Sequence, residues 1–205
     1  MKPLDQELEN ERQRTLEAIL KVAKACEYEE VHTQQVTRLA LKMFDDLAKF
    51  HHMGAQERFW LQAGALLHDI GWIEGWQAHH KTSLKIILNT PMLTLENRER
   101  LLIGSIARYH RKALPTTKHD HFASLDLSQR TIVTQLAAIL RVADGLDRSH
   151  RSVVRDLTAT VSAREIQISC QCDLPAYDEE QAALKKGDLL ENTYRRKLVI
   201  QWTMV

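Results

Sequence analysis

The chain has 205 residues, 44% of them hydrophobic, which is enough for one sizeable core that needs no disulfide to fold. Lys and Arg number 28 and Asp and Glu number 27, so the formal net charge is +1. This balance argues against a protein that binds nucleic acid or an anionic membrane through its overall charge. Any anion site must therefore be local.

The ends and the cysteines place the chain among soluble proteins. Residues 1–20 lack the apolar core of a secretory signal, and no run approaches the ~18 continuous apolar residues of a membrane span. We therefore expect a cytoplasmic protein with no membrane partner. Cys26 stands alone, and Cys170 and Cys172 lie two positions apart, which is neither a disulfide framework nor a complete zinc site. We expect three reduced, partly buried thiols.

Residues 5–143 have a helical pattern. Apolar residues recur at three- and four-residue spacing, as in Leu16, Ile19, Leu20 and Val22. Polar or Gly/Pro-containing breaks divide this part into roughly six helices. The predicted breaks are residues 28–30, 53–54, 71–75, 89–91 and 111–128.

The pattern changes after residue 149. LTATVSAREIQISCQC alternates and is rich in β-branched residues, which predicts two strands joined by a turn at 162–165. A helix is expected from Glu179 to Arg196, and LVIQWTMV reads as a final strand. The predicted fold is mostly α: a helical bundle of residues 1–152, with a small strand–strand–helix–strand α+β unit of residues 153–205 packed on it.

The strongest local feature is LQAGALLHDIGW, residues 61–72. Here an Ala/Leu-rich helix is expected to carry His68 and Asp69 and to end at Gly71. Neighbouring Cα atoms lie only ~3.8 Å apart, so the imidazole and the carboxylate can flank one ion, and the carboxylate can bridge two. A lone His-Asp dipeptide is weak evidence, so the case depends on its surroundings.

Other ligand types stand at helix ends. His32 opens one helix, His79 precedes SLKIIL, His110 closes IGSIARYH and Asp144 closes LAAILRVAD. Imidazole and carboxylate ligands without thiolate suit Mn, Fe, Co, Ni, Zn or, with water completing the shell, Mg. The sequence therefore predicts a site for one or two divalent metal ions. Its predicted ligands are His32, His68, Asp69, His79, His110 and Asp144.

The segments LLHDIGW, HHKTSLKIIL, ARYHRKALP and AAILRVADGLDRSHR carry a family resemblance. Their H…HD…H…H…D order resembles the HD phosphohydrolase superfamily. The similarity is closest to the HD domain in the C-terminal half of exopolyphosphatase and guanosine pentaphosphate phosphohydrolase proteins, and the strand-rich tail resembles the segment that follows there. The resemblance implies that His32, His68, Asp69 and Asp144 hold one cation. Asp69 would then bridge to a second cation held by His79 and His110.

Two departures limit what the resemblance implies. Those relatives often carry a histidine where this chain has Thr82, so one further ligand is missing. They also carry an actin-like phosphatase domain ahead of the HD part, for which this chain has no room. Exopolyphosphatase activity is therefore not expected from the resemblance.

The predicted chemistry is hydrolysis of a phosphate ester or anhydride by a metal-activated water. The expected catalytic residues are Asp69, His68 and Lys112, and the expected phosphate-binding residues are Arg111, Lys112 and Arg148. The other basic residues near the ligands could equally be a solvated rim or partners in ion pairs. These are Lys81, Arg108, Arg141 and Arg151.

Two residues are assigned to the second shell, with alternatives open. His80 could support a ligand, be a ligand itself or lie on the surface. Asp147 could hold Arg148 or Arg151 in place, or be a surface acid at a helix end. Trp60, Trp72 and Trp76 could line a pocket or pack in the core. The remaining histidines are expected on the surface or in loops: His51, His52, His119, His121 and His150.

Two functions fit these features. The first is a metal-dependent phosphohydrolase acting on a nucleotide or another small phosphorylated compound. The alternative is a non-catalytic regulatory module that binds a phosphorylated ligand, such as an alarmone or polyphosphate. Nucleic-acid binding draws only on RYHRKALPTTKH and DRSHR and lacks a binding motif. An Ala/Leu-rich surface helix could also build a homodimer, so the oligomeric state stays open.

Overall fold

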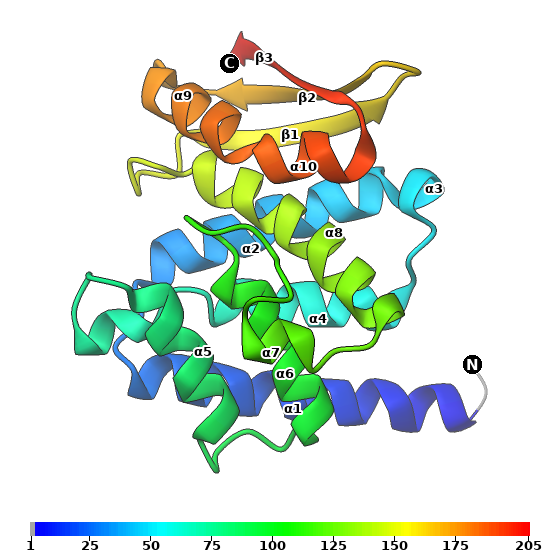
Figure 1. Ribbon diagram of the computed structural model, residues 1–205. Coiled ribbons are helices and arrows are strands. Elements are labelled where there is room, and N and C mark those ends of the chain that lie inside the picture. The colour runs from blue at the N-terminus through cyan, green and yellow to red at the C-terminus, as the bar shows by residue number, and fades with distance from the viewer. Residues whose placement is uncertain (1–2) are drawn as a thin grey trace.

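A computed structural model describes the backbone of residues 3–205 and the side chains of residues 10–205 (Figure 1). Residues 3–145 form helices joined by short connections. The elements are α1 (Pro3–Ala25), α2 (Glu30–Asp46), α3 (Ala48–His51), α4 (Ala55–Leu66), the 3-10 turn η1 (Ile70–Glu74), α5 (His79–Asn89), α6 (Asn97–Arg108), α7 (Asp120–Ala123) and α8 (Leu127–Gly145). The predicted breaks fall between these helices, although residues 71–75 and 111–128 contain η1 and α7.

The remaining residues form the predicted α+β unit. Its elements are β1 (Val154–Val161), β2 (Glu165–Cys172), α9 (Tyr177–Lys186), α10 (Asp188–Tyr194) and β3 (Lys197–Met204). The mostly α fold with a small C-terminal sheet is thus confirmed. The single helix expected from Glu179 to Arg196 is wrong, because the chain divides it at Gly187. A Cβ on Gly187 would lie 2.5 Å from Leu198 Cδ2, so the absence of a side chain here leaves room for Leu198 of β3.

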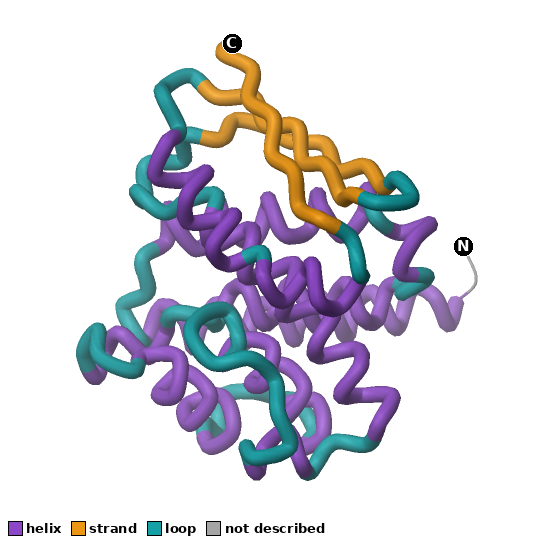
Figure 2. Tube along the Cα trace, turned by 45° about the horizontal axis from the view of Figure 1, so that its top comes forward, coloured by secondary structure: helices purple, strands orange, loops and turns teal. Residues whose placement is uncertain are grey.

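The three strands form one sheet in the order β1-β2-β3. β1 pairs with β2 in the antiparallel direction, and β2 pairs with β3 in the parallel direction, with Ile168 opposite both Ala159 and Ile200. The parallel pair requires a crossover, which α9 and α10 supply. Figure 2 shows these helices as a layer beneath the strands, and in Figure 1 the same layer lies next to α8.

One hydrophobic core crosses from the helices into the sheet. It joins Leu39 of α2 and Leu140 of α8 to Leu157 of β1 and Ile168 of β2, all at most 2% exposed. The predicted boundary between residues 152 and 153 stays a prediction, but the two sides share this core. Across residues 3–205 the helices are each too short or too polar to cross a bilayer.

The contact between α8 and α9 is unusually close. A Cβ on Gly145 would lie 2.5 Å from Ala183 Cα and 2.7 Å from Ala183 N, distances that real Cβ atoms do not show. Only glycine therefore permits this approach. This close contact fixes the end of α9 beside the end of α8, where Asp144 lies.

His51 was expected on the surface, and this is wrong. Its side chain is buried, with Nε2 2.9 Å from the carbonyl oxygen of Phe44 and Nδ1 accepting a hydrogen bond from Met53 N. The residue ties the short helix α3 to the end of α2, so its role is structural.

Candidate metal centre

His68 and Asp69 lie in a turn rather than on a helix. α4 ends at Leu66, Leu67 caps it, and the two residues lead into η1. Gly71 fixes this turn against α5, because a Cβ there would lie 2.1 Å from His79 O. Ser83 completes the attachment, since its hydroxyl donates to His68 O at 2.7 Å and accepts from Gly71 N at 2.9 Å. The dipeptide is thereby fixed next to His79.

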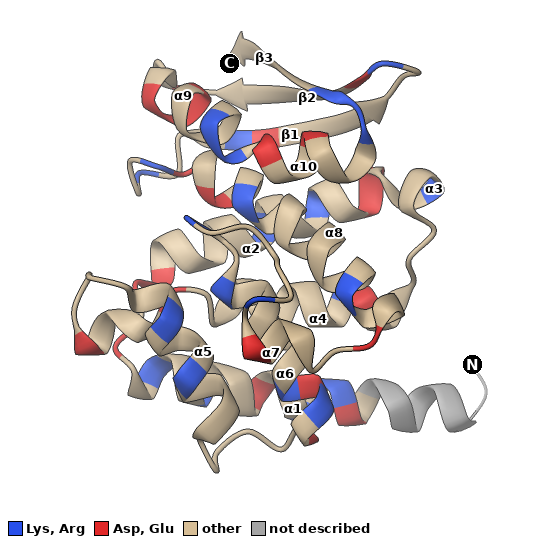
Figure 3. Cartoon of the chain, viewed as in Figure 1, with Lys and Arg blue, Asp and Glu red and all other residues tan. Residues whose placement is uncertain are grey.

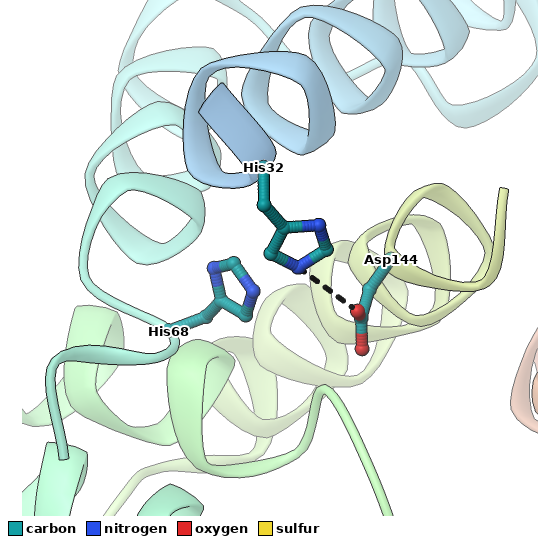
Figure 4. Close-up of side chains that lie close together, drawn as sticks. All are labelled: His32, His68 and Asp144. Carbon is teal, nitrogen blue, oxygen red and sulfur yellow. Dashed lines mark ion pairs between the residues drawn. The ribbon is translucent and has the colours of Figure 1, made fainter. Parts of the chain in front are cut away.

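A first cluster joins α2, the His-Asp turn and α8 (Figure 4). His32, His68 and Asp144 each place one nitrogen or oxygen within 4.8 Å of the others. His32 Nε2 lies 3.6 Å from Asp144 Oδ1 and 3.9 Å from Asp69 Oδ2. All three cluster side chains are at most 7% exposed.

A second cluster joins Asp69 to His79 of α5 and His110, which follows α6. Asp69 Oδ1 lies 3.0 Å from His79 Nε2 and 3.3 Å from His110 Nε2. Its other oxygen, Oδ2, lies 3.5 Å from His68 Nε2. The two oxygens of Asp69 thus face the two clusters separately, so this carboxylate joins them into one centre.

All four histidines present the same ring nitrogen to the centre. Nδ1 of His68, His79 and His110 lies 2.7–2.9 Å from the carbonyl oxygen three residues earlier, at Ala65, Trp76 and Ala107. A carbonyl only accepts, so each Nδ1 carries the proton and each Nε2 keeps a lone pair facing inward. Nδ1 of His32 lies 2.8 Å from Asp147 Oδ2 instead. Such partners orient histidines that bind metal ions.

The donor set fits a divalent cation. His32 Nε2, His68 Nε2 and Asp69 Oδ1 are buried and have no hydrogen-bond partner among the described residues. Leaving such atoms unpaired costs about 1–3 kcal/mol each. Ligand bonds of about 2.0–2.2 Å to one ion place neighbouring ligand atoms roughly 3–4 Å apart. The second cluster has separations of 3.0–3.4 Å, and in the first His32 Nε2 lies 3.6 Å from Asp144 Oδ1.

The pKa values reflect crowded opposite charges. Burial disfavours the charged form of both carboxylates, yet both pKa values lie below the usual range. For Asp69 the neighbouring His68 and His79 outweigh the effect of burial. For Asp144 the neighbouring Lys186 and His32 do so. Burial also opposes the charged form of His32, yet the carboxylates of Asp144 and Asp147 raise its pKa to about 10, so a metal ion would have to displace the proton on Nε2 to bind there. Burial, with smaller contributions from His68 and Lys186, lowers the pKa of His110, which favours the neutral, metal-binding form.

A cavity of about 470 Å³ opens over the clusters, within the range of small-molecule sites. Asp69, His79, His110 and Asp144 line it. So do the three predicted phosphate-binding residues, Arg111, Lys112 and Arg148, and Trp72 of η1. In Figure 3 the basic segments after α6, after α8 and at the end of α9 gather on one side of the molecule.

Two cationic residues of the cavity were missed by sequence reasoning. Lys185 and Lys186, at the end of α9, line the cavity, and Lys186 Nζ contacts Asp144 Oδ2. No local pattern relates Lys186 to a residue 42 positions earlier. The signal that could have found it is Gly145, because a glycine inside a helix indicates a close neighbour.

The structure decides between the alternatives left open for several residues. Arg141 lines the cavity, is buried and pairs with Asp188 at 2.8 Å, so the ion-pair alternative is correct and the solvated rim is not. Asp147 is fully buried and contacts His32, so neither the surface acid nor a partner for Arg148 or Arg151 is correct. His80 is 3% exposed, which excludes the surface alternative.

The loop histidines also lie deeper than expected. The ring of His150 stacks on His32 with centroids 3.8 Å apart, and His150 Nδ1 lies 2.6 Å from Glu29 Oε2. His119 and His121 are half-buried and pack against Tyr109, whose hydroxyl lies 2.8 Å from His119 Nδ1. Only His52 is exposed as predicted.

Three residues at or next to the site have left-handed backbone. Ala78, directly before His79, has φ 60°, Lys112 has φ 59° and His150 has φ 58°. For residues other than glycine this conformation costs of order 1–3 kcal/mol, and it is concentrated at functional sites.

The fold and the site define a mostly helical domain with a candidate His/Asp metal centre beneath a basic cavity. The chain belongs to the Ppx/GppA phosphatase domain III family, whose family model matches residues 12–193. The match confirms the predicted relation to the exopolyphosphatase and guanosine pentaphosphate phosphohydrolase family and so relates the chain to phosphatases. Among curated proteins, no sequence matches this chain.

Proposed function

We propose that this protein is a metal-dependent phosphohydrolase of the HD superfamily. It cleaves a phosphate ester or anhydride of a nucleotide or another small phosphorylated compound. The observation that carries the proposal is the set of six inward-facing ligand residues beneath a cavity lined by Arg111, Lys112 and Arg148. A cytoplasmic location remains an expectation from the sequence.

One or two divalent cations fit the two clusters. His32, His68 and Asp144 would hold one, His79 and His110 the other, and Asp69 would contribute one oxygen to each. A bound divalent ion lowers the pKa of a coordinated water and neutralises charge on phosphoryl oxygens. Mn, Mg, Fe, Co, Ni and Zn all suit these ligands.

The chain's own residues hold and orient the substrate. Arg111 offers a planar pair of donors to phosphoryl oxygens, and Lys112 offers a compact charge. Both directly follow His110, so they place a phosphoryl group close to the second cluster. Asp69 and His68 keep their acceptor atoms facing this position because Ser83 and Ala65 fix the turn that carries them.

The test is turnover by metal-loaded protein. Purified protein with Mn is assayed for phosphate release from nitrophenyl phosphate and a panel of nucleotides. We expect Asp69→Asn to lose at least about 100-fold in activity, since asparagine keeps only one of the two ligand oxygens and lacks the negative charge that both clusters share. Asp45→Asn, which removes a carboxylate paired with Arg58 on the surface, is the matched control.

Two results would contradict the proposal. One is wild-type activity in a folded Asp69→Asn protein. The other is no turnover with any of the six metals. In the second case, thermal stabilisation by a phosphorylated compound without hydrolysis would favour the regulatory, ligand-binding alternative.

A further inference from the structure

Arg108, the last residue of α6, is a buried cation without an acidic partner, and it is 5% exposed. The other two arginines of this helix have partners. Arg98 pairs with Asp126, and Arg100 Nε donates to Leu95 O at 3.0 Å. In the part of the chain whose side chains are described, no carboxylate pairs with Arg108, and its Nη1 has no hydrogen-bond partner. Burial lowers the pKa of this guanidinium, yet arginine stays charged in proteins, so a buried positive charge is left without compensation.

The neighbours of Arg108 are aromatic and imidazole rings. Its Cζ lies 5.6 Å from the centre of the Tyr109 ring, which attracts the cation but offers no acceptor to the N–H groups. The rings of His119 and His121 pack against Tyr109 with centroids 5.7 and 5.4 Å away. Burial lowers the pKa values of His80, His119 and His121, and Arg108 is the charged group that adds most to each shift. Arg108 therefore lies among three histidines, one from α5 and two from the segment that leads from α6 into α7.

Two of these rings hold a buried nitrogen that is also without a partner. His80 Nδ1 and His121 Nε2, like Arg108 Nη1, have no hydrogen-bond partner among the described residues. The pKa is about 3 for His80 and about 4 for His121, so both rings are neutral at pH 7. A neutral imidazole can carry its proton on either nitrogen, so each ring can turn an N–H donor toward the same space. Asp120, the acid that acts on His121, is exposed and does not pair with the guanidinium.

This group of residues is separate from the cavity over the metal centre. Arg111 and Lys112 line that cavity, whereas Arg108, His80 and His121 do not. One guanidinium balances one negative charge, and neutral histidines add donors without adding charge. Because Arg108 and His80 are only 5% and 3% exposed, a ligand here has to be small.

We propose that Arg108, His80 and His121 bind one small monovalent inorganic anion of the chloride class. Arg108 supplies the charge, and the two imidazoles supply N–H donors. The anion joins α5, α6 and the segment that enters α7, which lies against α6 (Figure 1). This segment begins with Arg111 and Lys112, so an ion that is not a substrate helps to hold the phosphate-binding residues in place. The inference does not depend on the proposed hydrolysis.

The first test is the Tm of the Mn-loaded protein while chloride replaces isethionate, an anion too large for the site, at constant ionic strength. We expect the wild-type Tm to rise by about 2–5 °C and to saturate, because a ligand that binds only the folded state stabilises it. Arg108→Met keeps much of the side-chain volume but loses the charge, so its Tm should rise by less than about 1 °C. Arg98→Met, which replaces an exposed arginine of the same helix, is the matched control and should keep the wild-type response.

A second measurement decides the matter if Arg108→Met does not fold. Wild-type protein should broaden the NMR line of chloride, bromide should reverse the broadening, and His121→Phe, which keeps a ring but loses the donor, should weaken binding by about 3–10-fold. A wild-type Tm that does not respond to chloride would mean that water satisfies the guanidinium, and it would overturn the inference. So would an equal response in Arg108→Met, or unchanged chloride binding in His121→Phe. A response that is lost in Lys112→Gln but kept in Arg108→Met would place the anion in the cavity instead, and the inference would again fail.

Discussion

Replacing Asp147 by Asn tests whether the buried contact between Asp147 and His32 prepares the metal centre. Asp147 Oδ2 lies 2.8 Å from His32 Nδ1, and Oδ1 accepts a hydrogen bond from Ser152 N at 2.8 Å. In the variant the amide oxygen must still face Ser152 N, because two donors would otherwise meet. The amide nitrogen then donates to His32 Nδ1 and drives the ring proton to Nε2. The lone pair that faces Asp144 is thereby lost.

The size of the effect follows from the role of such partners. Removing the group that orients a metal-binding histidine costs about 10–100-fold in metal affinity, or about 1.4–2.7 kcal/mol. The dissociation constant for Zn or Mn is measured by competition with a chromophoric chelator. Asp156→Asn, which changes a carboxylate that is 56% exposed, serves as the control. Binding by Asp147→Asn within about twofold of the wild type would refute the orientation argument.

Two further predictions concern stability. Gly145→Ala places a Cβ against the backbone of Ala183 and should destabilise the fold by about 1–3 kcal/mol. In a calorimetric scan the Tm should fall by roughly 3–10 °C. The control is Gly54→Ala, where the nearest atom is 3.7 Å from the added Cβ, and it should cost less than about 1 kcal/mol. Burial and the nearby Arg108 lower the pKa of His121 to about 4. Between pH 6.5 and about pH 4, His121 is protonated in the unfolded chain but neutral in the folded protein. Lowering the pH through this window therefore favours unfolding, so the Tm should fall, and it should fall less in His121→Gln. A Gly145→Ala protein as stable as the wild type, or equal pH profiles for His121→Gln and wild type, would contradict these expectations.

The helical part could be predicted well from the sequence because the pattern that identifies a helix lies within one segment of the chain. The three- and four-residue spacing and the polar breaks located the long helices, and the helix ends supplied His32, His79, His110 and Asp144. The alternating pattern after residue 153 likewise predicted β1 and β2. What these features share is that each depends on residues within one element or its immediate ends.

The missed features depend on packing between distant elements. Lys186 reaches Asp144 only because α9 crosses α8 at Gly145, and His150 stacks on His32 only because the chain turns sharply after α8. Asp147 is one turn beyond Asp144 in sequence, so it was paired with its neighbours Arg148 or Arg151. Its actual partner, His32, is 115 residues away. Neither spacing nor composition encodes these pairs.

The buried ligand atoms of the two clusters indicate what kind of ligand the site can bind. The inward-facing atoms are imidazole lone pairs and carboxylate oxygens, and these are all acceptors. An anionic ligand cannot satisfy them, because it would add further acceptors to a buried cluster. A module that bound phosphate without a metal ion would therefore use the cationic cavity residues Arg111, Lys112 and Arg148, but not His68 Nε2 and Asp69 Oδ1, which are buried without partners among the described residues. Both groups of residues are useful together when a cation and a phosphoryl group meet in one site, which is the arrangement that the proposed hydrolysis requires.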